Sequence, residues 1–145
     1  MIVMKFGGTS VESAAAIERV ASIVKARLDR RPVVIVSAMG KTTNALLAMA
    51  QAAAAGRKQE ALDRLSELRA YHECEIRPLV RNGEWPEALR ILNAHFDELA
   101  ELLGGLVHLG EFPPRSVDAV SSYGERLSSA LIAVAFRNLG IDAAH

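Results

Sequence analysis

The chain has 145 residues, the size of one ordinary domain with a real hydrophobic core. Half of the residues are hydrophobic and 23% are charged, and 17 basic residues balance 17 acidic ones. These values exclude a disordered chain, and without a basic excess we expect neither nucleic acid nor an anionic membrane surface as a partner.

The first predicted element is a buried strand over residues 2–6, which carries Lys5 and ends at Gly7-Gly8. Open α/β sheets bind ligands at the carboxyl ends of their strands. Glycines there let backbone N–H groups approach an anion, and lysine adds a compact positive charge. We therefore expect Lys5 to bridge the phosphates of a nucleotide. The alternative is a lysine that extends from a strand end into water.

A helix is predicted over about residues 11–29, where apolar side chains recur at helical spacing. Thr9 with Glu12, or else Ser13, provides its N-terminal cap. Residues 33–36 are β-branched and apolar throughout, as expected of a strand covered on both faces. Two strands joined by a helix form a right-handed βαβ unit with parallel strands.

The second predicted strand is followed by residues 37–44, Ser-Ala-Met-Gly-Lys-Thr-Thr-Asn. Residues 40–42 look like the end of a Walker A loop, but Ile35 stands where that pattern needs a glycine. What remains is a loop of small and hydroxyl residues before a helix that Asn44 would cap. Such a helix N-terminus suits a carboxylate or a phosphate, although capping alone would explain Thr43 or Asn44.

The rest of the chain reads as helical, with a loop predicted between Gly104-Gly105 and Pro113-Pro114. We expect Asn82-Gly83 to cap a helix rather than form a hairpin. The predicted helices cover residues 45–55, 59–81, 86–103 and 115–139. Residues 141–145 look like the start of a third strand, which would leave the sheet with an exposed edge and uncovered faces.

A third candidate site lies in residues 122–129 of the last predicted helix. Glu125 falls at the edge of the apolar stripe of this helix, not on the opposite, solvated face. Its carboxylate is suited to pair with a ligand ammonium or with a protein cation. A surface salt bridge, for example with Arg126 of a partner, explains the same position equally well.

The histidines and the single cysteine, Cys74, show no metal-ligand spacing and no nucleophile pattern, so we expect no metal site. One cysteine allows no internal disulfide, which fits a reducing cytoplasm. The first residues lack a signal-peptide pattern, and no apolar run is long enough to span a bilayer. We therefore expect a soluble, cytoplasmic protein without a membrane partner.

Three segments, residues 5–10, 37–44 and 122–129, together resemble the aspartate kinase family, in the order in which that family carries them. The Lys-Phe-Gly-Gly-Thr-Ser opening is the most specific of the three. The resemblance implies phosphoryl transfer from MgATP to the β-carboxylate of L-aspartate, in lysine, threonine and methionine biosynthesis. It implies ATP and its accompanying Mg²⁺ as cofactors, with no separate metal site.

The resemblance also implies roles for single residues. Lys5 would be catalytic and would stabilise the transferring phosphoryl group. Ser37 and Thr43 would contact the aspartate, and Glu125 would bind its α-ammonium group. The segment that would bind ATP comprises Lys5, Phe6, Gly7, Gly8, Thr9 and Ser10.

For the fold, the resemblance implies an α/β class: the N-terminal half of an amino-acid kinase-like αβα sandwich, with mainly parallel strands. Residues 1–145 would be a partial kinase domain with a helical insertion over residues 57–103. The family's glycine-rich nucleotide loop, its substrate-binding arginine and its ACT regulatory domains have no counterpart in this sequence. We expect the isolated chain to be inactive and the full-length enzyme to be a homodimer.

Two alternatives remain open at this stage. Another member of the amino-acid kinase family, acting on glutamate, acetylglutamate or a nucleotide, would share Lys5 and Gly7-Gly8. A non-catalytic half-domain that assembles with a full kinase is the other. The long helical segment resembles the lysine-sensitive and bifunctional branch, whereas residues 40–43 look more like the shorter branch, so the subclass stays open.

Overall fold

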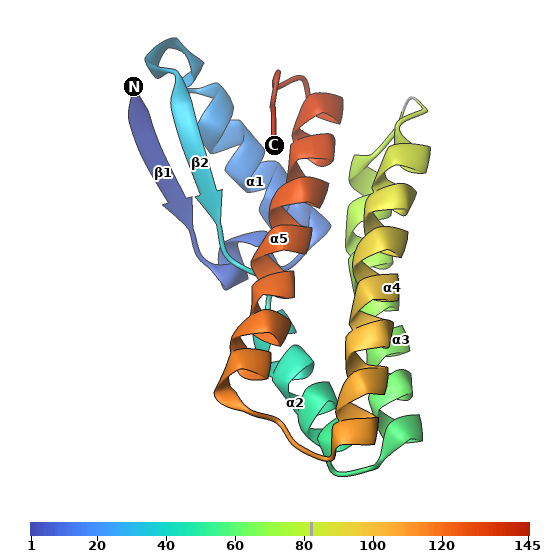
Figure 1. Cartoon of the computed structure of the whole chain (residues 1–145). Coiled ribbons are helices and arrows are strands. Elements are labelled where there is room, and N and C mark those ends of the chain that lie inside the picture. Colours follow the sequence, from blue (N-terminus) through green and yellow to red (C-terminus); the bar gives the residue numbers. More distant parts are fainter. Residues whose placement is uncertain (82) are drawn as a thin grey trace.

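The computed structural model describes residues 1–81 and 83–145, so the Asn82 part of the predicted cap lies outside the described residues. Two strands and two helices, α1 and α5, lie at one side of the molecule (Figure 1). A long hairpin of α3 and α4 runs beside α5, and α2 connects the two parts at the base. The α/β class is confirmed, and one hydrophobic core includes residues from both parts.

The sheet consists of β1 (Ile2–Phe6) and β2 (Pro32–Val36), which pair in parallel with Met4 opposite Val34. The chain between them forms α1 (Ala14–Lys25), so the predicted βαβ unit is confirmed. Side chains alternate along a strand, and here one set packs against the core while the other remains exposed.

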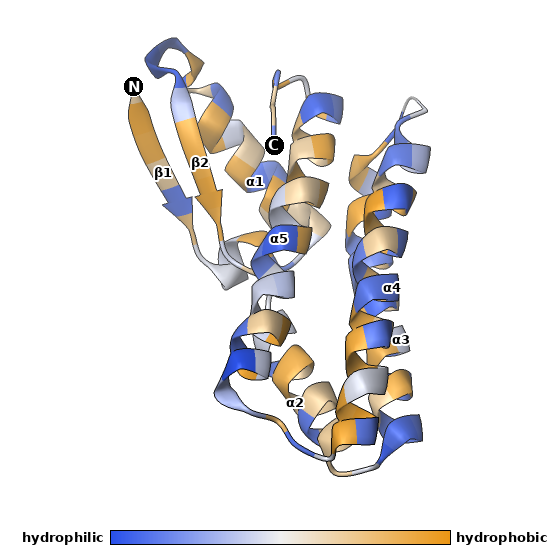
Figure 2. Cartoon of the chain, viewed as in Figure 1, coloured by the Kyte–Doolittle hydropathy of each residue, from blue (hydrophilic) through white to orange (hydrophobic). Residues whose placement is uncertain are grey.

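The prediction that the second strand is covered on both faces is wrong. Val33 is 46% exposed and Ile35 is 48% exposed, whereas Val34 and Val36 pack against the core. The physical reason is the placement of the helices: α1 and α5 lie against the same face of the sheet (Figure 1). The opposite face therefore presents its apolar side chains to solvent, and Figure 2 shows this hydrophobic colouring along both strands.

The α1 helix begins later than predicted, because a 3-10 turn (Gly8–Val11) comes first. Ser13 is the cap: its hydroxyl accepts a hydrogen bond of 3.2 Å from the Ala16 backbone nitrogen. After α1, a second 3-10 turn (Leu28–Arg30) leads into β2.

The predicted cap of the next helix is wrong, because α2 (Thr42–Ala54) already includes Asn44. The Thr42 hydroxyl is buried and donates to the Met39 carbonyl over 2.6 Å, and the helix begins three residues earlier than predicted. The predicted end of this helix near Gly56 agrees with the structure.

The helical hairpin consists of α3 (Lys58–Ile76), a 3-10 turn (Arg77–Leu79) and α4 (Trp85–Leu109). The prediction of a loop from Gly104-Gly105 is wrong, because α4 continues through both glycines to Leu109. Leu103 and Leu106 are buried on either side of the pair, so packing of the helix outweighs the low helix propensity of glycine.

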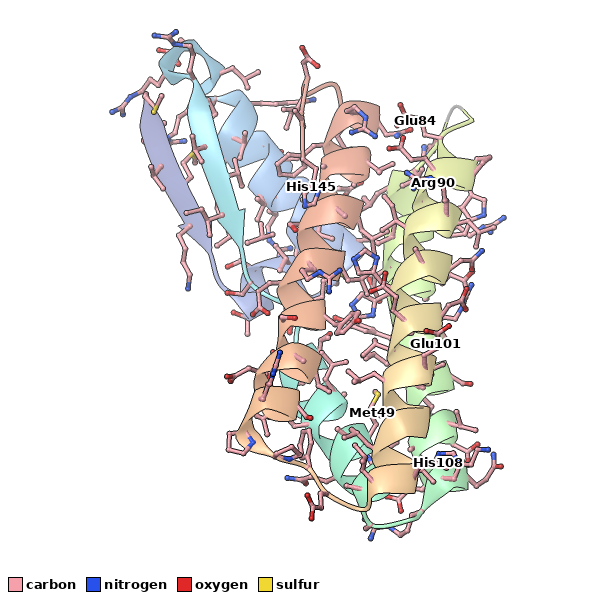
Figure 3. The ribbon with its side chains drawn as sticks, viewed as in Figure 1. Met49, Glu84, Arg90, Glu101, His108 and His145 are labelled. Carbon is pink, nitrogen blue, oxygen red and sulfur yellow. The ribbon has the colours of Figure 1, made fainter. Side chains whose placement is uncertain are left out.

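The last helix is α5 (Pro114–Asn138), as predicted. The prediction that residues 141–145 begin a third strand is wrong. Residues 141–145 pair instead with the end of α5: the Ile141 N–H donates to the Phe136 carbonyl over 2.9 Å. His145 lies beside the same helix (Figure 3), with its Nε2 2.9 Å from the Ser129 hydroxyl. In the described part of the chain, no helix is long and apolar enough to cross a membrane.

Candidate functional site at the strand ends

Lys5 lies next to the end of β1, where its side chain is exposed on the open face of the sheet. In the parallel pairing Lys5 lies opposite Ile35 of β2, which is on the same exposed face. Thr9 and Ser10 follow in the 3-10 turn, where the Ser10 N–H donates to the Gly7 carbonyl over 3.0 Å. The predicted nucleotide segment therefore runs from a strand end into a tight turn.

Gly8 joins this turn to the loop after β2. The Gly40 N–H donates to the Gly8 carbonyl over 3.0 Å, and the Ser37 N–H donates to the Phe6 carbonyl over 3.0 Å. A Cβ atom on Gly8 would lie 2.9 Å from the Ala38 carbonyl oxygen, closer than real Cβ contacts. A side chain here would push the two loops apart, so glycine is required for their contact.

Gly7 differs from its neighbour. A Cβ atom on Gly7 would meet nothing within 4 Å, so the space beside its backbone is open. The absence of a side chain leaves the peptide groups on either side accessible to an incoming group. In this glycine pair, Gly8 thus serves packing and Gly7 leaves room for a ligand.

The second loop ends at the N-terminus of α2. Thr43 is half-buried in the first turn of that helix, and Ser37 is half-buried directly after β2. The unpaired N–H groups of a helix N-terminus favour negative charge, which suits a carboxylate or phosphate. Ala38 and Met39 between them are buried and hold the loop against the core.

The third segment reaches this loop from α5. The Ser128 hydroxyl donates to the Ser37 carbonyl over 2.9 Å, across 91 residues of sequence. A Cβ atom on Gly124 would lie 2.7 Å from the Ala38 Cβ, so α5 approaches the loop as closely as its backbone permits. The structure thus brings together backbone from all three segments singled out in the sequence.

Glu125 follows Gly124 and has an exposed side chain. No ion pair of Glu125 is present in the part of the chain that the structure describes. Its neighbour Arg126 instead pairs with Glu98 of α4 over 3.6 Å and stacks on the ring of Tyr123. Within the described residues Glu125 is thus not engaged by a cation, and the predicted alternative, a surface salt bridge such as one with Arg126 of a partner, stays a prediction.

Among the residues that the structure describes, no ion pair joins Lys5 to Glu125. What meets here is mainly backbone: the turn at Gly8, the loop at Ser37 and the helix at Gly124. Lys5 precedes this turn, Glu125 directly follows Gly124, and both side chains are exposed. A negative group beside Lys5 and a positive group beside Glu125, on one ligand or on two, would use both charges.

The histidines follow structural roles. His72 is buried in α3, where its Nδ1 lies 2.8 Å from the Leu68 carbonyl and its Nε2 has no partner among the described residues. Burial lowers the pKa of His72. Among residues 1–81 and 83–145, no group of three or more His, Cys, Asp or Glu side chains is arranged to hold a metal ion.

Two contributors to this site were not identified from the sequence. Ser128 lies within the third segment, but only its contact with Ser37 shows that it anchors the loop. Tyr71 of α3 packs on the same loop from another side, and its hydroxyl donates to the Glu12 carbonyl over 2.5 Å. Sequence spacing gives no signal for a contact that joins residues 59 positions apart.

Comparison with known proteins adds independent findings. The model of the amino acid kinase family matches residues 1–145. Aspartokinase 2, chloroplastic, of Arabidopsis thaliana is 36% identical over 140 residues, covering 95% of this chain and 25% of that protein. Lysine-sensitive aspartokinase 3 of Escherichia coli K12 is 31% identical over 150 residues, covering 99% of this chain and 30% of that protein.

Among solved structures, E. coli aspartokinase III in complex with aspartate and ADP, in its R-state, superposes with a TM-score of 0.75 at 27% identity. The similarity covers 97% of this chain and 29% of that one. The chain therefore spans between a quarter and a third of the length of these relatives.

Proposed function

This chain belongs to the amino acid kinase family, and on that premise we propose that it forms the N-terminal part of an aspartate kinase. The enzyme would transfer the γ-phosphoryl group of MgATP to the β-carboxylate of L-aspartate. The observation that carries the proposal is the meeting of three loop and helix segments at Gly8, Ser37 and Gly124. The similarity to a structure that holds aspartate and ADP supports the same choice of ligands.

We assign the nucleotide to the end of β1. Lys5, exposed beside the open backbone of Gly7, would bind the ATP phosphates. The rest of the segment would contribute backbone N–H groups and hydroxyls from Phe6, Gly8, Thr9 and Ser10. Mg²⁺ would arrive bound to the nucleotide, because phosphate oxygens are its usual ligands.

We assign the aspartate to the loop after β2 and to α5. Ser37 and Thr43 would donate hydrogen bonds to the substrate near the N-terminus of α2. Glu125 would accept the α-ammonium group. Its lack of an ion pair within the described residues supports this role, since the carboxylate needs no release from a protein cation.

The reaction follows from this arrangement. An oxygen of the substrate β-carboxylate attacks the γ-phosphorus, and the bond from that phosphorus to the bridging oxygen of ADP breaks. The products are an acyl phosphate and ADP. Enzymes accelerate such transfers by positioning and by stabilising charge, and the Lys5 ammonium would stabilise the charge on the phosphoryl oxygens.

We further propose that residues 1–145 are a partial kinase domain and that residues 57–103 form a helical insertion within it. The coverage of only 25% of a relative supports this, as does the open face of the sheet. The remaining nucleotide loop, the substrate arginine and the ACT domains would lie elsewhere in the enzyme, which we expect to be a homodimer. The single cysteine supports a cytoplasmic location.

The test uses the complete polypeptide that contains this chain, with MgATP and L-aspartate. We expect aspartate-dependent ADP release and an acyl phosphate that hydroxylamine traps. ADP release that depends on glutamate or acetylglutamate instead would contradict the proposal. The isolated 145-residue chain serves as the comparison, and we expect it to show no turnover because it holds only part of the site.

A variant sharpens this test. Glu125→Gln keeps the shape of the side chain but removes its charge, so the KM for aspartate should rise about tenfold or more. Asp118→Asn is the matched control, because Asp118 is another exposed carboxylate of α5. An unchanged KM in Glu125→Gln would return Glu125 to a surface role.

A further inference from the structure

The helical hairpin contacts the candidate site through one face of α3. Tyr71 lies on this face, and its hydroxyl donates to the Glu12 carbonyl over 2.5 Å. The same hydroxyl lies close to the loop after β2: a Cβ atom built on Gly40 would lie only 2.9 Å from it, so a side chain has no room there. Gly40 has a φ of +53°, so this backbone conformation and this contact both require glycine.

Glu75 lies one helical turn further along α3. Its carboxylate accepts a 2.8 Å hydrogen bond from the backbone N–H of Ala14, the first residue of α1. That N–H has no partner within α1, because the first N–H groups of a helix lack carbonyls to bond. A negative charge at this position is also favoured by the helix dipole. Glu75 therefore caps α1 from a different helix.

These contacts form a continuous set. The Gly40 N–H donates to the Gly8 carbonyl, and the Tyr71 hydroxyl fills the space beside Gly40 where a Cβ atom would lie. The same hydroxyl donates to the Glu12 carbonyl, and the Glu75 carboxylate accepts from the Ala14 N–H. The connection from β1 to α1 is thus held by the second loop at its start and by α3 at its end. Thr9 and Ser10, the last residues of the predicted nucleotide segment, lie between these points.

On this side the loop borders an open groove. A groove of about 580 Å³ borders it, lined among others by Ser13, Gly40, Thr42 and Tyr71. Burial, with the Glu75 and Glu12 carboxylates nearby, raises the pKa of Tyr71 to about 12. The hydroxyl therefore keeps its proton and remains a hydrogen-bond donor.

From this geometry we propose that Tyr71 and Glu75 are positioning residues: α3 sets the conformation of the Gly40 loop and of the β1–α1 connection, and thereby the placement of both substrates. The helical hairpin is then a support of the site and not only a bulky insertion. Neither side chain needs to touch a substrate. The effect on substrates rests on the proposed function, whereas the effect on the two loops does not.

The first test is amide hydrogen exchange of the 145-residue chain, read at single residues by NMR. Tyr71→Phe removes the hydrogen bond to the Glu12 carbonyl and leaves the bond from the Gly40 N–H to Gly8 without this support. Exchange of the Gly40 N–H should therefore accelerate by up to about fivefold, the factor that one lost hydrogen bond would give. In Glu75→Ala, the Ala14 N–H should accelerate by about the same factor. Exchange of the Leu131 amide in the core of α5 should stay as in the original chain in both variants.

Two variants serve as controls. Glu75→Gln keeps an oxygen that can accept from Ala14, so exchange there should stay near the original rate. Tyr123→Phe removes a tyrosine hydroxyl that bonds to Glu98 over 3.0 Å, away from the Gly40 loop, and should leave Gly40 unchanged. Unchanged exchange at Gly40 and Ala14, or equal acceleration at Leu131, would overturn the positioning role.

The second test uses the complete polypeptide and separates the two proposals. If it is an aspartate kinase, Tyr71→Phe should raise the KM values for aspartate and ATP about fivefold without moving the pH profile of kcat. Unchanged KM values in an active enzyme would overturn the coupling to substrates. If the original polypeptide has no aspartate kinase activity, the proposed function fails, and the exchange experiment still decides the role of α3.

Discussion

The two parts of the molecule bury their apolar side chains in different ways. In the α3–α4 hairpin and α2, the apolar residues face one another, and Leu92, Leu99 and Leu103 are at most 1% exposed. In the β1–β2 sheet, Val3 is 61% exposed and Ile35 is 48% exposed. Figure 2 shows hydrophobic colour on the inner faces of the helices and along most of both strands, with a hydrophilic stretch near the end of β1.

The difference shows which part of the molecule buries its apolar side chains completely and which part leaves them exposed. The helices complete their own packing, whereas the sheet keeps an apolar face and, at its carboxyl end, Lys5 and Gly7. Contiguous exposed apolar surface is typical of surfaces that another segment or partner covers. The candidate site thus lies where the open sheet region meets the closed helical region.

The largest expected effect is on the free energy of unfolding, and it tests this comparison directly. Leu99→Ala leaves a cavity in the helical part, so it should lower the free energy of unfolding by about 2–5 kcal/mol. Val33→Ala removes atoms from a side chain that is 46% exposed, so its cost should stay below about 1 kcal/mol. Urea denaturation of the 145-residue variants measures both. Equal costs would show that the sheet face is covered in solution.

The next effect is on kcat and concerns Lys5 at the exposed sheet. In the complete enzyme, Lys5→Ala should lower kcat about 10²–10³-fold, because its charge would act on the phosphoryl group in the transition state. Steady-state kinetics at saturating aspartate and ATP measure this. Lys58→Ala is the control, a lysine at the start of α3 in the closed part. Normal turnover of Lys5→Ala would exclude the phosphate role.

A smaller effect tests the contact between the two parts of the site. Gly124→Ala places a Cβ atom 2.7 Å from Ala38, so it should destabilise the chain by about 1–3 kcal/mol. Gly105→Ala, inside α4 near its C-terminal end and with open space around it, should instead stabilise by about 0.5–1 kcal/mol. Chemical denaturation distinguishes the signs. If both variants are stabilised, α5 does not press on the loop.

The smallest expected effect is a pH dependence of the helical part. Burial lowers the pKa of His72 in the folded chain, so its contribution to stability is complete above the unfolded pKa of about 6.5. It is lost as the pH falls through the folded pKa, by at most about 1.4 kcal/mol per pH unit.

Unfolding curves between pH 7 and 5, a range of about two units around the unfolded pKa, should show this slope. His72→Phe should reduce it, because the ring that must remain neutral is gone. His108→Gln should retain it, since His108 is exposed on α4. An unchanged slope in His72→Phe would assign the acid sensitivity to other groups.

Local patterns predicted much of the fold. The strands at residues 2–6 and 33–36, the parallel pairing and the last helix follow from periodicity and β-branching, and the structure confirms them. The wrong predictions at Gly104-Gly105 and Asn44 both relied on the helix propensity of single residues. Packing of Leu103 and Leu106, and the bond from Thr42 to Met39, overrode the propensities of single residues.

For the candidate site, the sequence by itself determined the residue types: a lysine and glycines after one strand, hydroxyl residues after the next, and a glutamate at the border of an apolar stripe. These signals are local, within a few residues of each other. The tertiary structure alone decided which backbones touch, because Ser128 and Ser37 lie 91 residues apart, and Tyr71 and Glu12 lie 59 apart. Such contacts depend on how whole helices pack, which no spacing within one segment specifies.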